Sequence, residues 1–356
     1  MTAEDEHGDG KEDAARRGGR RRRGLLKAAG IALAGVLVLS AAGAGWAYWH
    51  LNHNIKSVDI NSALGDDRPA RAVSTPSVSA SAAASPLPSG ALNILVLGSD
   101  SRSGKANAKL GGGSSSGARS DTAMVVHIDE GRTKATVVSI PRDTLVTRPS
   151  CPTSSGGTTS VAYHAMFNSA YSVGGPVCAV KTVESLTDVR MDHYIEIDFS
   201  GFADLVDALG GVTVTTDEDI DDDKSHLHLT AGEHHLDGTK ALALARTRHG
   251  IGDGSDLGRI GLQQKLVKAL LRQISSTDLL TDPAKLYQVA NAVTGSLTTD
   301  TGLDSLGELM KLGQSLKGLS SEDVKTVMMP VVTAPSDPNR VVANEPEASE
   351  LWASLK

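Results

Sequence analysis

Apolar residues along this chain recur with two different periods, which predict strands in some segments and helices in others. Short apolar runs bounded by Gly, Asp or Arg predict strands at 91–102, where the run breaks at Gly98, at 122–129 and at 133–143. Residues 192–214 alternate in "YIEIDF", change to helical spacing and stop at two glycines, which predicts a strand, a short helix and a strand.

Helical spacing dominates the second half of the chain. A helix is predicted in 236–248, starting near Asp237, and a strongly amphipathic one at 256–276. Shorter patterns predict helices near 283–292 and 303–318 and a strand at 324–332. Strands mixed with helices imply a layered α/β fold.

The N-terminal segment combines an arginine cluster with a long apolar run. The arginines lie within residues 16–23, and residues 28–49 are nearly all apolar. About 20 apolar residues can cross a bilayer as a helix, and the positive-inside rule would keep the arginines cytoplasmic. A twin-arginine export signal in "RRGLLK" and cleavage at "AGA", 42–44, are the alternatives, and both would also export the rest of the chain.

These patterns predict five parts. They are a cytoplasmic basic arm at 1–24, a transmembrane helix at 25–49, a Ser/Ala/Pro-rich linker at 50–90, an extracellular catalytic domain at 91–334 and a loose C-terminal tail at 335–356. The protein is therefore expected in the cell membrane as a single-pass protein.

The net charge excludes one class of function, and the two cysteines predict a disulfide. The net charge of −7 argues against general nucleic-acid binding, which needs a basic surface. The two cysteines, Cys151 and Cys178, both lie in the part expected outside the membrane, where a disulfide is the default state. A catalytic thiol is the alternative.

Charged residues follow or precede three predicted strands. The pairs are Asp100 and Arg102, Arg119 and Asp121, and Arg142 and Asp143; Arg246, Arg248 and Arg259 follow later in the chain. Residues just beyond strand ends gather in the crevice where α/β proteins bind ligands. Arginine matches phosphate oxygens two at a time, and Mg²⁺ takes one or two carboxylates together with phosphate oxygens. Aspartates together with several arginines suit a diphosphate with one divalent cation, Mg²⁺ or Mn²⁺, and surface salt bridges at the strand ends are the alternative.

The same residues carry a resemblance to a known family. The segments "NILVLGSDSR", "RSDTAMVVHID", "VVSIPRDTLV", "GFADLVDALGGV", "LDGTKALALARTR" and "DLGRIGLQQ" resemble, in order, the motifs of the LytR-CpsA-Psr family. They cover roughly residues 91–275. The resemblance implies that family's fold, a central mixed sheet flanked by helices behind one membrane helix.

The resemblance also implies an activity. Family members transfer a glycopolymer from a polyprenyl pyrophosphate to peptidoglycan, typically at the MurNAc 6-hydroxyl, through a phosphodiester. Residues expected to bind the pyrophosphate are Arg102, Arg119, Arg142, Arg246, Arg248, Arg259 and Gln263, with Arg119 and Arg142 also catalytic. The resemblance also implies that Asp100 and Asp121 bind Mg²⁺. Asp143 and Asp256 are candidate general bases from their position. A non-catalytic sensor of lipid pyrophosphate and a pyrophosphatase are the alternative functions.

Some features depart from the family or carry no expected role. Leu262 stands where the family often has Arg, which weakens the assignment of the neighbouring glutamines. The acidic segment 217–223 lacks EF-hand spacing, and the histidines of 226–235 lack fixed zinc-ligand spacing, so solvated loops are expected at both. Asn168 is expected to serve packing or capping.

Overall fold

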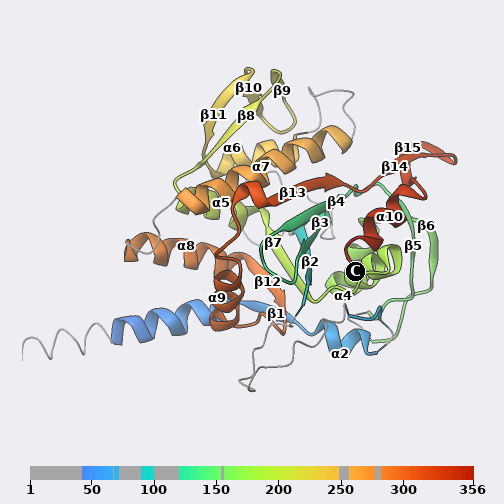
Figure 1. Cartoon of the computed structure of the whole chain (residues 1–356), viewed down its shortest axis with the longest axis horizontal. Coiled ribbons are helices and arrows are strands. Elements are labelled where there is room, and N and C mark those ends of the chain that lie inside the picture. The colour runs from blue at the N-terminus through green and yellow to red at the C-terminus, as the bar shows by residue number, and fades with distance from the viewer. Residues whose placement is uncertain are drawn as a thin grey trace, which may run out of the picture. The chain divides into compact units, whose positions relative to one another are not determined.

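A seven-stranded mixed sheet forms the centre of the larger unit, in the strand order β1-β12-β7-β2-β3-β4-β13 (Figure 1). The computed structural model describes residues 42–66, 68–71, 90–99, 120–153, 156–247, 256–276 and 282–356, with the backbone alone at 120, 121, 256 and 257. The strands of this sheet are β1 (Lys56–Val58), β2 (Leu92–Ser99), β3 (Ser120–Ile128), β4 (Ala135–Ile140), β7 (His193–Asp198), β12 (Leu297–Asp300) and β13 (Val324–Met328).

The sheet mixes parallel and antiparallel pairs. β2 runs antiparallel to β3 and parallel to β7, while β4 runs antiparallel to β3 and parallel to β13. The central strands are buried on both faces, as their continuous apolar runs predict. The α/β class and the predicted strand–helix–strand unit at 192–214 are confirmed.

Helices cover both faces of the sheet (Figure 1). They are α2 (Ile60–Leu64), α4 (Ser169–Thr187), α5 (Phe199–Ala208), α6 (Gly238–Arg246), α7 (Asp256–Ser276), α8 (Pro283–Ser296), α9 (Leu306–Ser315) and α10 (Glu347–Ala353). One core lies between the sheet and α4, α10 and α2, and a second between the opposite face and α7 and α9. A third core joins α5, α6 and α7 to small strands.

Four two-stranded antiparallel sheets complete the described part of the unit. They pair β5 (Leu145–Arg148) with β6 (Ala162–Met166), β8 (Val212–Thr216) with β11 (Gly232–Leu236), β9 (Ile220–Asp222) with β10 (Leu227–Leu229), and β14 (Val331–Ala334) with β15 (Asp337–Ala343). A single 3₁₀ turn, Ser321–Asp323, leads into β13.

The predicted disulfide between Cys151 and Cys178 is confirmed. The two Cα atoms lie 5.2 Å apart, and both side chains are fully buried. The bond joins the loop that precedes β6 to the middle of α4. Cross-linking residues 27 positions apart restricts the unfolded chain, which stabilises the native state by about 3–4 kcal/mol in the chain-entropy model.

The segment expected to be a linker, 50–90, is in part a docked element of the unit. β1 adds a parallel edge strand to β12, and α2 buries Ile60 and Leu64 in the core beneath α4. The Ser/Ala/Pro-rich composition that predicts a linker belongs to residues 74–90. The earlier stretch "KSVDINSAL" has apolar residues in a strand and a helix that are too short to show a period.

Arg68 fixes this docked segment to α4. Its guanidinium group donates to both carboxylate oxygens of Glu184, at 2.6–3.1 Å, and to the carbonyl oxygen of Met191 at 2.7 Å. The Arg68 and Glu184 side chains are only 2% and 3% exposed, so this is a buried bidentate ion pair.

The C-terminal segment 335–356 is not the loose tail expected from its composition. It contains β15 and α10, and Trp352 and Leu355 are buried at 3% and 4% exposure in the same core as α4. The apolar residues of this segment are scattered among polar ones and give little hydrophobic signal along the sequence, yet Trp352 and Leu355 pack into the core.

The N-terminal residues form a separate unit, 1–50, apart from 51–356. Residues 42–54 are helical, and the predicted basic arm and most of the predicted transmembrane segment lie outside the described residues. Within the described part of the chain, no helix combines the length and apolar character needed to cross a membrane.

Removing the buried ion pair tests the docking of residues 54–71. Arg68→Ala leaves the Glu184 charge buried and unpaired, so we expect the free energy of unfolding to fall by about 3–5 kcal/mol. Arg71→Ala is the matched control, because Arg71 is half exposed and pairs with Asp192 at 3.3 Å; it should cost less than about 1 kcal/mol. Urea denaturation measures both, and equal losses would contradict the assignment.

Candidate functional site

Four strands have their ends side by side along one rim of the central sheet, and this row of strand ends is the edge at which the candidate site lies. Ser99, the last residue of β2, pairs with Ser120 at the start of β3 and with Asp198 at the end of β7. β4 ends beside the same part of β3, because Ile140 pairs with Ala123. The ends of β2, β4 and β7 and the start of β3 therefore lie at a single edge.

The pairing of β2 with β3 is irregular at this edge. Gly98 pairs with Thr122 and Ser99 with Ser120, so the backbone of Asp121 is the extra residue of a bulge on β3. A Cβ atom at Gly98 would lie 3.2 Å from the Thr122 Cβ, which explains why glycine allows the close approach. Asp100 follows Ser99 directly in the sequence but lies outside the described residues, so the structure does not test its pairing with Asp121.

Gln263 on α7 links this edge to two other elements. Its side-chain amide donates to the Thr122 hydroxyl oxygen and to the Ala245 carbonyl oxygen, each at 2.9 Å. The side chain is 95% buried, since only 5% is exposed. The contact joins the first residues of β3 to the end of α6, one residue before Arg246.

Two of the predicted arginines lie on the elements that Gln263 joins. Arg259 precedes Gln263 by one helical turn and therefore shares its face of α7; it is only 3% exposed. Arg246 ends α6, and its guanidinium carbon lies 5.0 Å from the ring centroid of Phe199, which begins α5 directly after β7. Both arginines thus lie on elements that contact this edge, Arg259 on the helix bonded to β3 and Arg246 beside the residue that follows β7.

Arg142 and Asp143 lie in the loop that follows β4. The backbone N–H groups of Phe167 and Asn168 donate to the carbonyl oxygens of Thr144 and Arg142, at 2.8 and 3.2 Å. The Arg142 Nε lies 3.5 Å from Asp143 Oδ2. The loop is therefore held by the residues that begin α4, and Asn168 takes part through its backbone.

Several predicted residues fall outside the described part of the chain. These are Asp100, Arg102, Arg119 and Arg248, together with the side chains of Asp121 and Asp256. Their predicted roles stay predictions.

A buried polar network joins α4 to β7 next to this edge, and it was not predicted from the sequence. The hydroxyl groups of Tyr171 on α4 and Tyr194 on β7 each donate to Glu196 at 2.7 Å. Burial, followed by the charge of Glu196, raises the pKa of both tyrosines, which keeps them protonated as donors. Glu196 lies two residues before the end of β7. The only sequence signal is its inward position in the alternating strand "YIEIDF".

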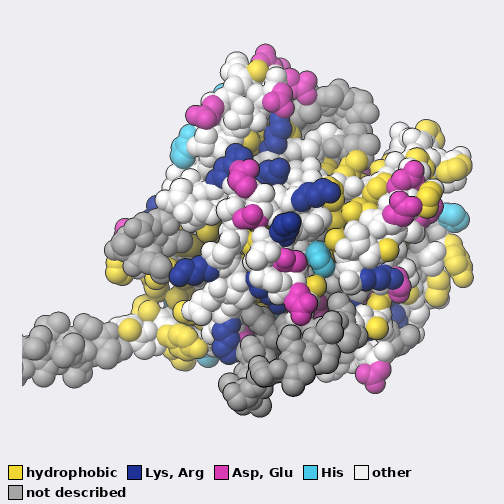
Figure 2. Space-filling view, viewed as in Figure 1, with side chains coloured by type: hydrophobic (Ala, Val, Ile, Leu, Met, Phe, Trp, Pro, Cys, Tyr) yellow, Lys and Arg dark blue, Asp and Glu magenta, His cyan; other side chains and the backbone are white. Residues whose placement is uncertain are grey.

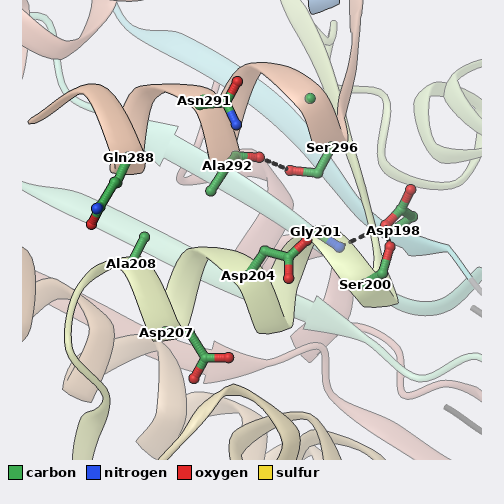
Figure 3. A pocket seen from close by; sticks show the side chains of 11 residues that line it. Asp198, Ser200, Gly201, Asp204, Asp207, Ala208, Gln288, Asn291, Ala292 and Ser296 are labelled. Atoms are coloured by element: carbon green, nitrogen blue, oxygen red, sulfur yellow. Dashed lines mark hydrogen bonds between the residues drawn. The ribbon is translucent and has the colours of Figure 1, made fainter. Parts of the chain in front are cut away.

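A polar groove of about 490 Å³ runs between α5 and α8 and includes Asp198 at the same sheet edge (Figure 3). Asp204 and Asp207 from α5 and Gln288 and Asn291 from α8 line it. Burial raises the pKa of Asp204, and the nearby charges of Asp207 and Asp198 add to this effect. The groove is thus suited to hydroxyl or amine groups and unsuited to anions.

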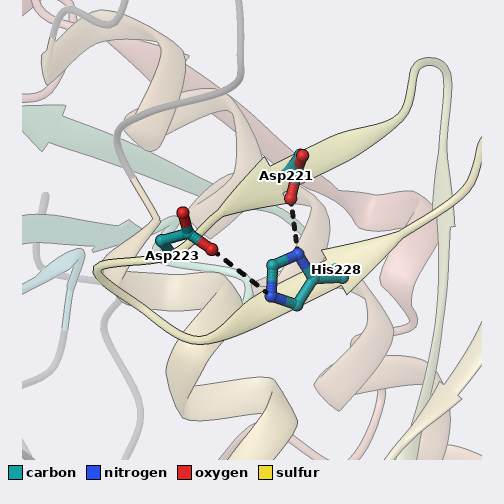
Figure 4. A group of neighbouring side chains, drawn as sticks. All are labelled: Asp221, Asp223 and His228. Carbon is teal, nitrogen blue, oxygen red and sulfur yellow. Dashed lines mark hydrogen bonds and ion pairs between the residues drawn. The ribbon is translucent and has the colours of Figure 1, made fainter.

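The acidic and histidine-rich segments meet on the β9–β10 hairpin (Figure 4). Asp221, Asp223 and His228 bring one ligand atom each within 4.8 Å of one another, and all three are exposed. His228 Nδ1 lies 2.5 Å from Asp221, and Nε2 lies 3.8 Å from Asp223. Because ion pairing accounts for this geometry, we assign the cluster no role.

One face of the molecule carries charged and apolar side chains next to one another. Figure 2 shows Lys and Arg side chains over α6 and α7 and below them, with Asp and Glu side chains among them and hydrophobic side chains beside them toward β14 and α10. Cationic side chains next to an apolar surface suit a ligand with an anionic group and an apolar chain.

Comparisons with known proteins agree with this geometry. The LytR_cpsA_psr family model matches residues 47–356. A Corynebacterium glutamicum protein named probable cell wall biosynthesis protein LcpB is 34% identical over 272 residues, which are 74% of this chain and 61% of that protein. The Bacillus subtilis polyisoprenyl-teichoic acid–peptidoglycan teichoic acid transferase TagV is 32% identical over 238 residues, 65% of this chain and 57% of that protein. The chain thus spans less than two thirds of the length of both relatives.

A solved structure shares the fold. The LytR-Csp2A-Psr enzyme from Actinomyces oris superposes with a TM-score of 0.60 at 23% identity, over 84% of this chain and 95% of that one. At this identity the likeness establishes the architecture alone. The family match, which covers everything from residue 47 onward, shows that the chain belongs to the LytR-CpsA-Psr family.

Proposed function

We propose that this protein is a phosphotransferase that moves a glycopolymer from a polyprenyl pyrophosphate onto peptidoglycan. Membership of the family supports the proposal, as does the name of the Bacillus subtilis relative, a teichoic acid transferase. The observation that carries it is the bridge made by Gln263, which joins the start of β3 to α6 and α7, the two helices that carry Arg246 and Arg259.

The arginines supply the electrostatics that this reaction needs. Phosphoryl transfer depends on positioning and on neutralising the oxygens more than on covalent chemistry by the protein. Arg142, Arg246 and Arg259 come from the β4 loop, α6 and α7, and with Arg102, Arg119 and Arg248 they would hold the donor pyrophosphate. Burial of Arg259 strengthens its interaction with phosphate, because the surrounding dielectric is low.

The reaction exchanges one phosphorus–oxygen bond for another. A peptidoglycan hydroxyl attacks the phosphorus that carries the glycan, the bond to the bridging oxygen breaks, and polyprenyl phosphate leaves. The hydroxyl proton passes to a base. Both oxygens of Asp143 face arginines, Oδ2 toward Arg142 and Oδ1 toward Arg340, so we favour Asp256 as the base and Asp143 as a partner of Arg142.

A divalent cation suits the residues at this edge. Asp100 follows the last residue of β2 in the sequence, Asp121 lies near the start of β3, and carboxylates are the protein ligands that Mg²⁺ and Mn²⁺ take beside phosphate. When bound, the cation would neutralise charge on the pyrophosphate. Asp100 and Asp121 would hold it in place.

The lipid and the cell membrane complete the proposal. The hydrophobic surface beside the cationic side chains would receive the polyprenyl chain (Figure 2). The basic arm and the apolar run 28–49 support a single-pass anchor, and the disulfide supports a domain outside the membrane, where thiols are oxidised.

Conservative arginine substitutions test the phosphate clamp. Lys keeps the charge of Arg but loses the planar fork, so Arg142→Lys and Arg246→Lys should each lower kcat/KM by about 10-fold, and the Ala variants by up to about 100-fold. The assay supplies a synthetic lipid-linked glycan and peptidoglycan oligomers. Wild-type rates in both Lys variants would exclude the clamp.

The same assay tests the activity itself. Release of free glycan phosphate without a joined product would favour a pyrophosphatase. Donor binding without turnover, given an authentic acceptor, would favour a sensor of lipid pyrophosphate.

Metal dependence has its own test. Asp100→Ala and Asp121→Ala should each abolish Mg²⁺-dependent turnover, while the urea midpoint stays close to that of the wild type, because both aspartates lie at a strand end. Asp217→Ala is the control, since Asp217 is exposed and pairs only with Lys265 among the described residues. Full activity in excess EDTA would contradict a metal role.

Topology can be measured separately. A reporter fused after Lys356, which is exposed, should be active only outside the cell. An active reporter in the cytoplasm would contradict the proposed orientation, and mature protein that lacks residues 1–44 would show cleavage in place of an anchor.

A further inference from the structure

We infer that the hairpin β14–β15 is part of the candidate site, and that Arg340 on β15 is a positioning residue that controls the availability of Arg142 through Asp143. The inference rests on the proposed function, which assigns Arg142 to the donor pyrophosphate. Arg340 lies in the segment 335–356, which its composition predicts to be a tail, and it is far in sequence from every segment that resembles the family.

A continuous chain of charges links β15 to the β4 loop. Arg340 lies 3.3 Å from Asp143 Oδ1, and Arg142 Nε lies 3.5 Å from Asp143 Oδ2. One carboxylate therefore faces two arginines, one through each oxygen. Arg340 also lies 3.9 Å from Asp337 on its own strand, a longer and more exposed contact.

The backbone brings the two segments together independently of these charges. Thr144 and Val341 form an isolated parallel bridge, and the Val341 N–H lies 3.5 Å from the Asp143 carbonyl oxygen. On the other side, Phe167 and Asn168 hold the same loop by backbone hydrogen bonds. Arg340 thus contacts a loop that backbone hydrogen bonds also hold, and it adds a contact to that loop as well as a charge beside Arg142.

The electrostatic consequence concerns how strongly Asp143 holds Arg142. While Arg340 shares the carboxylate, the attraction of Asp143 is divided between two guanidinium groups, so Asp143 holds Arg142 less strongly. Without Arg340, the full charge of Asp143 acts on Arg142 and competes with the ligand. Removal of a residue that need not touch the donor should therefore weaken donor binding.

Partial exposure separates this role from a role in folding. The Arg340 and Asp143 side chains are 31% and 19% exposed, and ion pairs in such positions contribute little to stability. Arg340→Met, which keeps the apolar stem, should therefore leave the melting temperature within about 2 °C of the wild type.

The first measurement is the affinity for geranyl pyrophosphate, a soluble probe with the donor's head group. We expect Arg340→Met to weaken binding about 3- to 10-fold and Arg340→Lys to restore most of it, because the charge that shares Asp143 returns. Arg272→Met is the matched control, because Arg272 is an exposed α7 arginine paired with Glu322 at 3.8 Å; it should bind as the wild type does. Wild-type affinity in Arg340→Met would overturn the inference, as would a loss that Lys does not restore.

A double variant tests whether Arg340 acts through Asp143. If it does, adding Asp143→Asn to Arg340→Met should cost no further affinity, because the competing charge is gone. Losses that multiply would show that Arg340 acts on its own and would overturn the route through Asp143.

A ligand-free readout separates this inference from the proposed function. Hydrogen exchange of residues 141–146 should change in Arg340→Met and stay unchanged in Arg272→Met, since only the first removes a contact to that loop. Unchanged exchange in both overturns the inference whatever the ligand data show. If the wild-type protein binds the probe but never joins glycan to peptidoglycan, the proposed transferase activity is wrong. The comparison of affinities between the variants remains valid in that case.

Discussion

The register of β2 against its two neighbours is the constraint on which the candidate site depends. Ser99 is paired on both sides, with Ser120 and with Asp198, so three strand ends have no freedom relative to one another. A slip of one residue would turn Leu95 and Leu97 away from the core beneath α4 and carry the end of β2 away from β3. The buried apolar faces of the sheet therefore fix the positions of charged residues that contribute nothing to the core.

Rigid support extends below this edge. Glu196 accepts from Tyr171 and Tyr194, which ties β7 to α4 just before the strand ends. Fully satisfied buried networks of this kind restrict motion, because every alternative arrangement leaves a polar group unpaired. Charge stabilisation at a site works best when its dipoles and charges are held in place before the ligand arrives. The network and the Gln263 bridge both serve that end.

The elements that could be predicted from the sequence are those with a clear local pattern of apolar residues. The apolar runs of β2, β3 and β4 and the spacing of α7 are strong periodic signals, and Asp237 caps α6 as its position predicts. The charged strand ends could be predicted because strands that pair must bring their ends together. β1 could not, since three residues show no period, and its place depends on β12, more than 200 residues later. Arg340 was missed for the same reason, because its partner lies far away in sequence.

The docked segment before β2 decides where the folded unit can be cut. A recombinant fragment that starts at residue 90, the boundary that composition suggests, would keep every candidate site residue. It would lose β1, which leaves the backbone of β12 as an open edge ready to pair with another chain. It would also lose Arg68, so Glu184 would carry its charge into the core alone. Such a fragment is expected to aggregate. Its inactivity would then result from the missing edge strand β1 and from the unpaired carboxylate of Glu184, and it would not show that the site residues are unimportant.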